Sequence, residues 1–156
     1  MSRLFYTTLA VVPADVRDQV GLGYLFARAA DTIADTDLID RPRRLDFLGQ
    51  LKAQFVSDRI SWSQIHEIQR AVGPLQQDSS ERVLLERLED CFRLYLDCSP
   101  EDRRRVQRLM TTLTQGMEMD LSCFPGQSVE DLTALKTVDD LDQYTYYVAG
   151  CVGEFW

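Results

Sequence analysis

The sequence predicts an all-α fold in a single domain. Apolar residues recur every three or four positions along most of the 156 residues, which is the period of an amphipathic helix. No stretch shows the strict alternation of polar and apolar residues that a half-buried strand has. Serine, aspartate and proline stand where these helices would begin, whereas Gly73-Pro74 and Phe124-Pro125-Gly126 interrupt the pattern. We therefore expect helices throughout, without internal repeats or a linker.

The first strong helical segment runs from Pro13 to Thr36 and carries its polar residues on one side. Because successive residues of a helix are turned by about 100°, Tyr24, Arg28, Asp31 and Asp35 share one stripe. The opposite side is apolar and is expected to face the core. Small residues form a shoulder beside the stripe that would let another helix approach closely: Gly23, Ala27, Ala30 and Ala34.

Two interpretations of this polar stripe remain open. A solvated surface of an ordinary amphipathic helix is the simpler one. Val20 and Tyr24 lie on the same stripe, however, which favours a stripe that lines a cavity. Carboxylates four residues apart, such as Asp31 and Asp35, repel each other by roughly 0.2–0.5 kcal/mol on a helix. A bound cation would remove this conflict, and Mg²⁺ is commonly held by one or two carboxylates together with water and phosphate oxygens.

The middle of the chain predicts four more helices with core-facing apolar stripes. Serine and aspartate at their starts are the side chains that cap a helix N-terminus, and proline is favoured in the first turn. The expected helices open at Pro42, span Ile60 to Val72, run from Asp78 to about Cys98, and run from Ser99 to about Leu121.

Two helices are expected after the Phe124 break. The first is short, from Ser128 to Leu135, and the second begins at Val138. Gly150 and Gly153 stand inside the periodic pattern of the second helix, where each costs about 1 kcal/mol relative to alanine. We expect a close approach of another backbone to offset this cost.

Composition narrows the classes of function. A net charge of −8 argues against a nucleic-acid partner, which requires clustered lysine and arginine. The chain lacks the roughly 18–20 consecutive apolar residues of a membrane span and a convincing signal-peptide cleavage site, so we expect a cytoplasmic protein. Peripheral membrane association is left open. Four cysteines without a C-x-x-C pair and a single histidine do not predict a zinc or thiol-redox site.

Five motifs give the chain a resemblance to the squalene/phytoene synthases. In order, they read S-R-L-F, L-x-x-V-P, Y-x-x-x-R-x-x-D-T-I-A-D, Q-G-M-E-M-D-L and Y-T-Y-Y-V-A-G-C-V-G, and together they extend from Ser2 to Gly153. The strings D-T-I-A-D-T and Y-Y-V-A-G-C-V-G-E-F-W look most like bacterial squalene synthases, whereas G-M-E-M-D-L matches phytoene synthases equally well. The resemblance implies an isoprenoid-synthase-type helical fold around a central apolar cavity.

The resemblance also implies an activity and its cofactors. It points to a head-to-head prenyl transferase that condenses two farnesyl diphosphates through presqualene diphosphate to squalene. A phytoene synthase acting on geranylgeranyl diphosphate is the alternative, and a non-catalytic helical fragment is a third interpretation from another class. Mg²⁺ is the implied cofactor, with NADPH in addition if squalene is the product. The implied partner is the prenyl diphosphate substrate, and the oligomeric state is left open.

Specific residues receive roles through this resemblance. Asp31 and Asp35 match the first aspartate-rich motif, which holds Mg²⁺. Tyr144 is the implied catalytic aromatic residue, with Tyr147 as the less favoured candidate, and Arg28 would stabilise the developing negative charge. The residues implied in binding the substrate are Ser2, Arg3, Phe5, Tyr24 and Arg28. Gly116, Met117 and Asp120 are expected either to line the opposite wall or to serve packing alone.

The chain also departs from the family pattern. Leu4 occupies the third position of the usual S-x-S-F segment, and Ala34 stands where squalene synthases often carry glutamate. A second D-x-x-x-D motif is not found, because Asp139, Asp140 and Asp142 lack its spacing. We therefore expect residues 1–156 to be the N-terminal part of a single squalene/phytoene synthase domain, incomplete at the C-terminus and inactive by itself.

Overall fold

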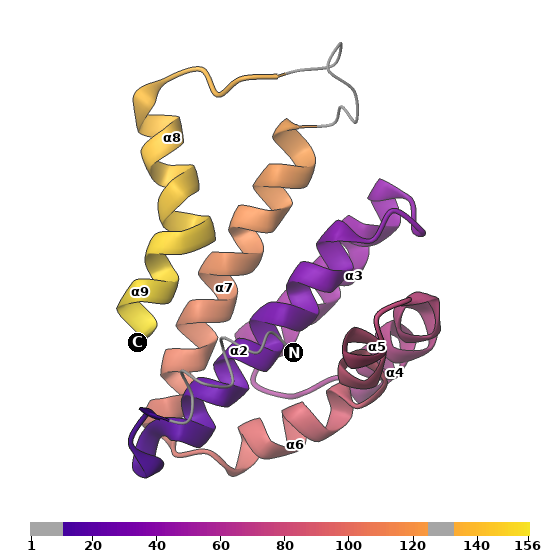
Figure 1. The fold of residues 1–156 in the computed structure, drawn as a ribbon, viewed down its shortest axis with the longest axis vertical. Helices are drawn as coiled ribbons and strands as arrows, with labels where there is room; N and C mark the ends of the chain where they lie inside the picture. Colours follow the sequence, from indigo (N-terminus) through magenta and orange to yellow (C-terminus); the bar gives the residue numbers. More distant parts are fainter. Residues whose placement is uncertain (1–10, 125–132) are drawn as a thin grey trace.

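The structure is a computed structural model that describes residues 11–124 and 133–156, and these residues form helices without a strand. The prediction of an all-α fold is confirmed (Figure 1). A 3-10 turn, Gly73–Leu75, follows α4, and a π-helical turn, Tyr146–Gly150, joins α8 to α9. The α-helices are α2 (Ala14–Asp35), α3 (Arg41–Val56), α4 (Trp62–Val72), α5 (Ser79–Glu86), α6 (Leu88–Asp97), α7 (Pro100–Cys123), α8 (Val138–Thr145) and α9 (Cys151–Phe155).

Helices α2, α3 and α7 form the centre of the molecule, since α7 packs against both of the others. Helices α4, α5 and α6 cover one side of this centre, and the rod of α8 and α9 lies along the other side of α7 (Figure 1). None of the helices within the described ranges combines the length and the apolar character needed to cross a membrane.

An aromatic cluster fixes the orientation of α2. Phe26 is fully buried, and its ring lies 4.9 Å from that of Phe55, 4.7 Å from Phe92 and 6.0 Å from Tyr95, measured between centroids. Such pairs contribute about 0.5–1.5 kcal/mol beyond the burial of their area. Because the cluster holds the apolar side of α2 against α3 and α6, the polar stripe of α2 must face away from it.

The predicted helix starts agree with the structure at four places. The Asp40 carboxylate accepts a hydrogen bond from the Arg43 N–H at 2.9 Å, immediately before the Pro42 turn. Asp78 caps α5 by accepting from two backbone N–H groups, and Ser99 caps α7. The α8 cap is a reciprocal capping box between Thr137 and Asp140.

The expected helix from Asp78 to Cys98 is divided into two. Arg87 leaves helical geometry, with φ −108° and ψ 20°, and the chain turns there. Helix α5 packs on α2, α4 and the 3-10 turn, whereas α6 packs on α2 and α4. A straight helix could not bury both Leu85 against α4 and the 3-10 turn and Phe92 in the aromatic cluster around Phe26.

The prediction that another backbone approaches Gly150 and Gly153 closely is wrong. A Cβ built on Gly153 would meet nothing within 4 Å, and at Gly150 the nearest atoms belong to Tyr146 of the same rod. The close approach occurs at Gly116 of α7, where a Cβ would lie 2.9 Å from the Tyr147 Cβ and 3.1 Å from its carbonyl carbon. Gly150 instead ends the π-helical turn, an irregularity that side-chain periodicity does not reveal.

The short helix expected from Ser128 to Leu135 lies largely outside the described residues, and its described part, 133–135, is not helical. The cysteines are free thiols. Cys91 and Cys151 are buried, and Cys98 and Cys123 are partly buried.

Candidate functional site

The candidate site is built on the polar stripe of α2. Phe26 and Ile33 bury the opposite side of the helix completely. Arg28 and Asp31 are therefore half-buried, and Asp35, in the last turn, is exposed. The stripe lies at the surface of α2 that faces α5 and the C-terminal half of α7, since Arg28 and Asp35 interact with residues of those two helices.

Arg28 is held between two carboxylates. Its Nη1 donates to Asp31 Oδ2 at 2.5 Å, one turn along the same helix, and its Nη2 donates to Glu81 Oε1 in the first turn of α5. Burial lowers the pKa of Arg28, but the negative charges of Asp31 and Glu81 more than offset burial, so the pKa is raised. The guanidinium is thus a permanent, oriented cation that still reaches solvent.

Glu81 was not predicted to belong to the site. Its only signal was its place three residues after the N-cap Asp78, where glutamate is favoured because it can complete a capping box. In the structure the Glu81 side chain reaches across to Arg28 instead. Local spacing predicted the helix start but could not reveal a partner 53 positions away.

Asp35 lies in an acidic environment. Although the residue as a whole is exposed, desolvation of its carboxylate by neighbouring atoms raises its pKa, and the charges of Asp31 and Asp120 raise it further, while Arg28 and Arg44 act in the opposite direction. The Arg44 Nη1 is itself fixed by the carbonyl of Ala34 at 2.8 Å. The carboxylates of α2 and Asp120 of α7 therefore belong to one electrostatic cluster.

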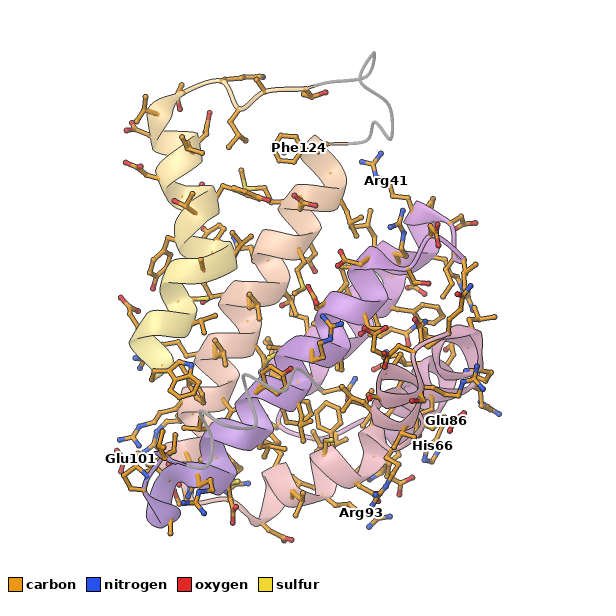
Figure 2. The ribbon with its side chains drawn as sticks, in the orientation of Figure 1. Arg41, His66, Glu86, Arg93, Glu101 and Phe124 are labelled. Atoms are coloured by element: carbon orange, nitrogen blue, oxygen red, sulfur yellow. The ribbon has the colours of Figure 1, made fainter. Side chains whose placement is uncertain are left out.

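Tyr144 of α8 is connected to the same cluster. Its hydroxyl donates to Asp120 Oδ1 at 2.6 Å, and this hydrogen bond, followed by burial, raises the pKa of Tyr144 to about 12. The ring of Phe124 lies edge-on to Tyr144 at 5.8 Å between centroids, at the end of α7 that Figure 2 labels. The phenol is consequently protonated at neutral pH and restrained in orientation.

The other described residues that were predicted to belong to the site lie in the polar cluster or in the packing around it. The Tyr147 hydroxyl accepts a hydrogen bond from Gln115 Nε2 at 3.3 Å, and Tyr147 packs on Gly116. Met117 packs against the core, so it and Gly116 serve packing, whereas Asp120 takes part in the polar cluster. Ser2, Arg3 and Phe5 lie outside the described residues.

A pocket of about 420 Å³ opens between α2 and α5 beside the Arg28–Glu81 pair. Tyr24, Leu25 and Arg28 form its α2 side, and Glu81 and Leu84 form part of its α5 side. Asp78 and Ser80 also line the α5 side, so the pocket joins one cation, two carboxylates and apolar surface. Polar groups beside apolar surface are what a ligand with a polar head and an apolar tail requires.

The donor set suits a hard divalent cation only in part. Asp31 and Asp35 provide carboxylate oxygens at adjacent turns. The pKa of Asp35 is raised first by burial and then by repulsion from Asp31 and Asp120, and a cation would relieve only the repulsion. Within ranges 11–124 and 133–156, no three His, Cys, Asp or Glu side chains group closely enough to hold a metal by themselves. The residues fit a Mg²⁺ ion whose remaining ligands are water and phosphate oxygens.

Comparison with known proteins identifies relatives of the chain. It is 28% identical over 162 residues to the bifunctional lycopene cyclase/phytoene synthase of Sporisorium reilianum, with 98% of this chain and 23% of that protein covered. It is 27% identical to the squalene synthase of Saccharomyces cerevisiae and 29% identical to that of Botryococcus braunii, which it covers to 31% and 29%. The chain thus spans less than a third of the length of these relatives. No solved structure shows significant similarity to the chain.

The match to the squalene/phytoene synthase family extends over residues 1–156. It includes both the α2 stripe and the α7–α8 contact that converge on the site. The chain therefore belongs to the squalene/phytoene synthase family.

Proposed function

We propose that the chain contributes residues to the active site of a Mg²⁺-dependent head-to-head prenyl transferase. In this proposal the enzyme condenses two farnesyl diphosphates through presqualene diphosphate to squalene, with NADPH as the reductant. The observation that carries the proposal is the convergence of Arg28, the carboxylates of Asp31, Asp35 and Asp120, and the Tyr144 phenol from α2, α7 and α8.

Arg28 would bind the diphosphate of the substrate. Two of the five N–H groups of its guanidinium are engaged by Asp31 and Glu81, so the others can face a phosphate. The planar fork makes paired hydrogen bonds to phosphate oxygens, and it keeps its charge at every physiological pH. Its position beside the pocket of about 420 Å³ supports this role, because a prenyl tail needs apolar surface next to the headgroup.

Asp31 and Asp35 would hold Mg²⁺, which supplies charge stabilisation to the departing diphosphate. Tyr144 would act on the allylic cation that remains after the diphosphate leaves. Its aromatic face can stabilise an allylic cation by about 1–2 kcal/mol in a site from which water is excluded. The hydrogen bond to Asp120 restrains the orientation of the ring, so that the same aromatic face is presented to the cation.

A phytoene synthase activity on geranylgeranyl diphosphate is the second candidate. One of the relatives combines a phytoene synthase with a lycopene cyclase, while the others named above are squalene synthases. Both candidates use the same headgroup chemistry and differ in the length of the prenyl tail.

The test is calorimetric titration of the chain with farnesyl and geranylgeranyl diphosphate, with and without Mg²⁺, followed by mass spectrometry of the products. We expect Mg²⁺-dependent binding that Asp31→Asn and Asp35→Asn each weaken by tenfold or more, because each removes a charged ligand, about 1.4 kcal/mol per tenfold. Arg28→Lys should also weaken binding, since an ammonium lacks the planar fork. Because residues 1–156 are expected to be inactive by themselves, binding without turnover agrees with the proposal, whereas no binding would contradict it.

A further inference from the structure

We propose that Glu81 is a positioning residue that fixes the guanidinium of Arg28 for ligand binding. This inference rests on the proposed function, because it concerns how Arg28 meets a diphosphate. Glu81 belongs to none of the five sequence motifs, and it comes from a different helix from the stripe that it serves.

The two carboxylates that hold Arg28 are not equivalent. Asp31 is on the same helix at i+3 and would be recruited by a cation bound to the stripe. Glu81 projects from α5 and is more buried, with 23% of its side chain exposed against 40% for Asp31. When a cation draws Asp31 away, Glu81 is the partner that continues to hold the guanidinium.

Glu81 is itself held in place by its helix. Asp78 Oδ1 accepts hydrogen bonds from the backbone N–H groups of Ser80 at 2.7 Å and Glu81 at 3.1 Å. This cap fixes the first turn of α5, and α5 packs directly on α2. Glu81 therefore starts from a rigid backbone, and its carboxylate can restrict an arginine side chain that would otherwise sample many rotamers.

Removing the charge of Glu81 and removing its hydrogen bond have opposite expected effects on an anionic ligand. Loss of the negative charge alone reduces repulsion of the ligand and favours binding. Loss of the acceptor releases Arg28, which must then be ordered when the ligand binds. Glu81→Gln loses the charge but keeps an acceptor, whereas Glu81→Ala loses both. Comparing these two variants isolates positioning from charge.

The experiment measures the affinity of the whole chain for inorganic diphosphate in the presence of Mg²⁺ by calorimetry. We expect Glu81→Ala to bind about fivefold more weakly than Glu81→Gln, the cost of ordering one long side chain. In parallel, the ¹⁵N-labelled guanidinium signals of Arg28, assigned by their loss in Arg28→Lys, are recorded with Mg²⁺ and before diphosphate is added. They should remain restricted in Glu81→Gln and become averaged by free rotation in Glu81→Ala.

The matched control is the same pair of substitutions at Glu89 of α6. Its carboxylate also joins two helices, since it contacts His66 of α4 and Arg93, and its side chain is 28% exposed. Glu89→Ala and Glu89→Gln should bind diphosphate equally. Equal affinities of the two Glu81 variants, or identical Arg28 signals in them, would overturn the positioning role alone. Failure of the unsubstituted chain to bind diphosphate would contradict the proposed function, and the role of Glu81 in ligand binding would fall with it.

Discussion

At the scale of single residues, the acidic cluster lowers the stability of the fold at neutral pH. A carboxyl whose pKa is higher in the folded chain than in the unfolded chain favours folding in its protonated form, so its ionisation at neutral pH costs stability. Asp35 is such a group, because burial and the charges of Asp31 and Asp120 raise its pKa. A side chain selected only for stability would not carry a charge here.

We therefore expect Asp35→Asn to raise the thermal unfolding midpoint at pH 7. The gain should shrink as the pH falls and vanish below the ordinary carboxyl pKa of about 3.9, where Asp35 is protonated in both states. Circular dichroism melting curves between pH 3 and 7 measure this difference. Asp58→Asn, on an exposed bend, is the control and should leave the midpoint unchanged. A lower midpoint for Asp35→Asn at pH 7 would mean that the carboxylate is stabilised by partners.

Tyr144 allows a direct test of the contact between α7 and α8. Its pKa is raised to about 12, first by the hydrogen bond to Asp120 and then by burial. Asp120→Asn should move this pKa toward the ordinary tyrosine value of about 10, since an amide does not repel a phenolate as a carboxylate does. The measurement is an ultraviolet pH titration, with Tyr144→Phe subtracted to isolate the signal. An unchanged curve would show that the two side chains do not interact in solution.

At the scale of secondary structure, the sequence predicted the helix starts well and the irregularities poorly. Asp78 and Ser99 indicate helix starts because an N-cap is a local interaction that the side chain itself makes. The break at Arg87 and the π-helical turn at Tyr146–Gly150 depend on neighbours far along the chain. The α2 stripe was predictable because it follows from local helical spacing. The ion pair between Glu81 and Arg28 and the hydrogen bond from Tyr144 to Asp120 join residues far apart in the sequence, so they were not predictable.

Two glycines should respond to alanine in opposite ways. In Gly116→Ala the new Cβ would lie 2.9 Å from the Tyr147 Cβ, so α7 and the π-helical turn must separate, at a cost of about 1–3 kcal/mol. In Gly153→Ala the Cβ meets nothing within 4 Å, and the better helix propensity of alanine should stabilise the chain by up to about 1 kcal/mol. Urea unfolding measures both changes. Equal effects would show that the rod of α8 and α9 does not pack on Gly116.

At the scale of the whole molecule, apolar side chains are exposed along α8 and the π-helical turn. Val138 is 72% exposed, Leu141 48% and Tyr146 42%. Val138 and Leu141 are three residues apart and therefore share one side of α8, and exposed apolar side chains that lie together are typical of a face that contacts another protein surface.

We accordingly expect concentration-dependent self-association of the 156-residue chain in sedimentation velocity experiments. Leu141→Glu should reduce it, because a charge on this face opposes its burial against another copy. Leu96→Glu, at a similarly exposed leucine of α6, is the control and should have no effect. A chain that remains monomeric at high concentration would rule out this face as a site of association.

Helix α8 contains no buried residue, so its order depends on a few contacts at its end. The hydrogen bond from Tyr144 to Asp120 and the edge-on ring contact between Tyr144 and Phe124 connect it to α7. Elements with so little burial open locally at a small fraction of the global unfolding free energy, and their amides exchange with solvent first. Because the charge of Asp120 also acts on Asp35, a cation held by Asp31 and Asp35 would act electrostatically on the contact between α7 and α8. Ligand binding would then register as slower amide exchange in a helix that the ligand itself does not touch.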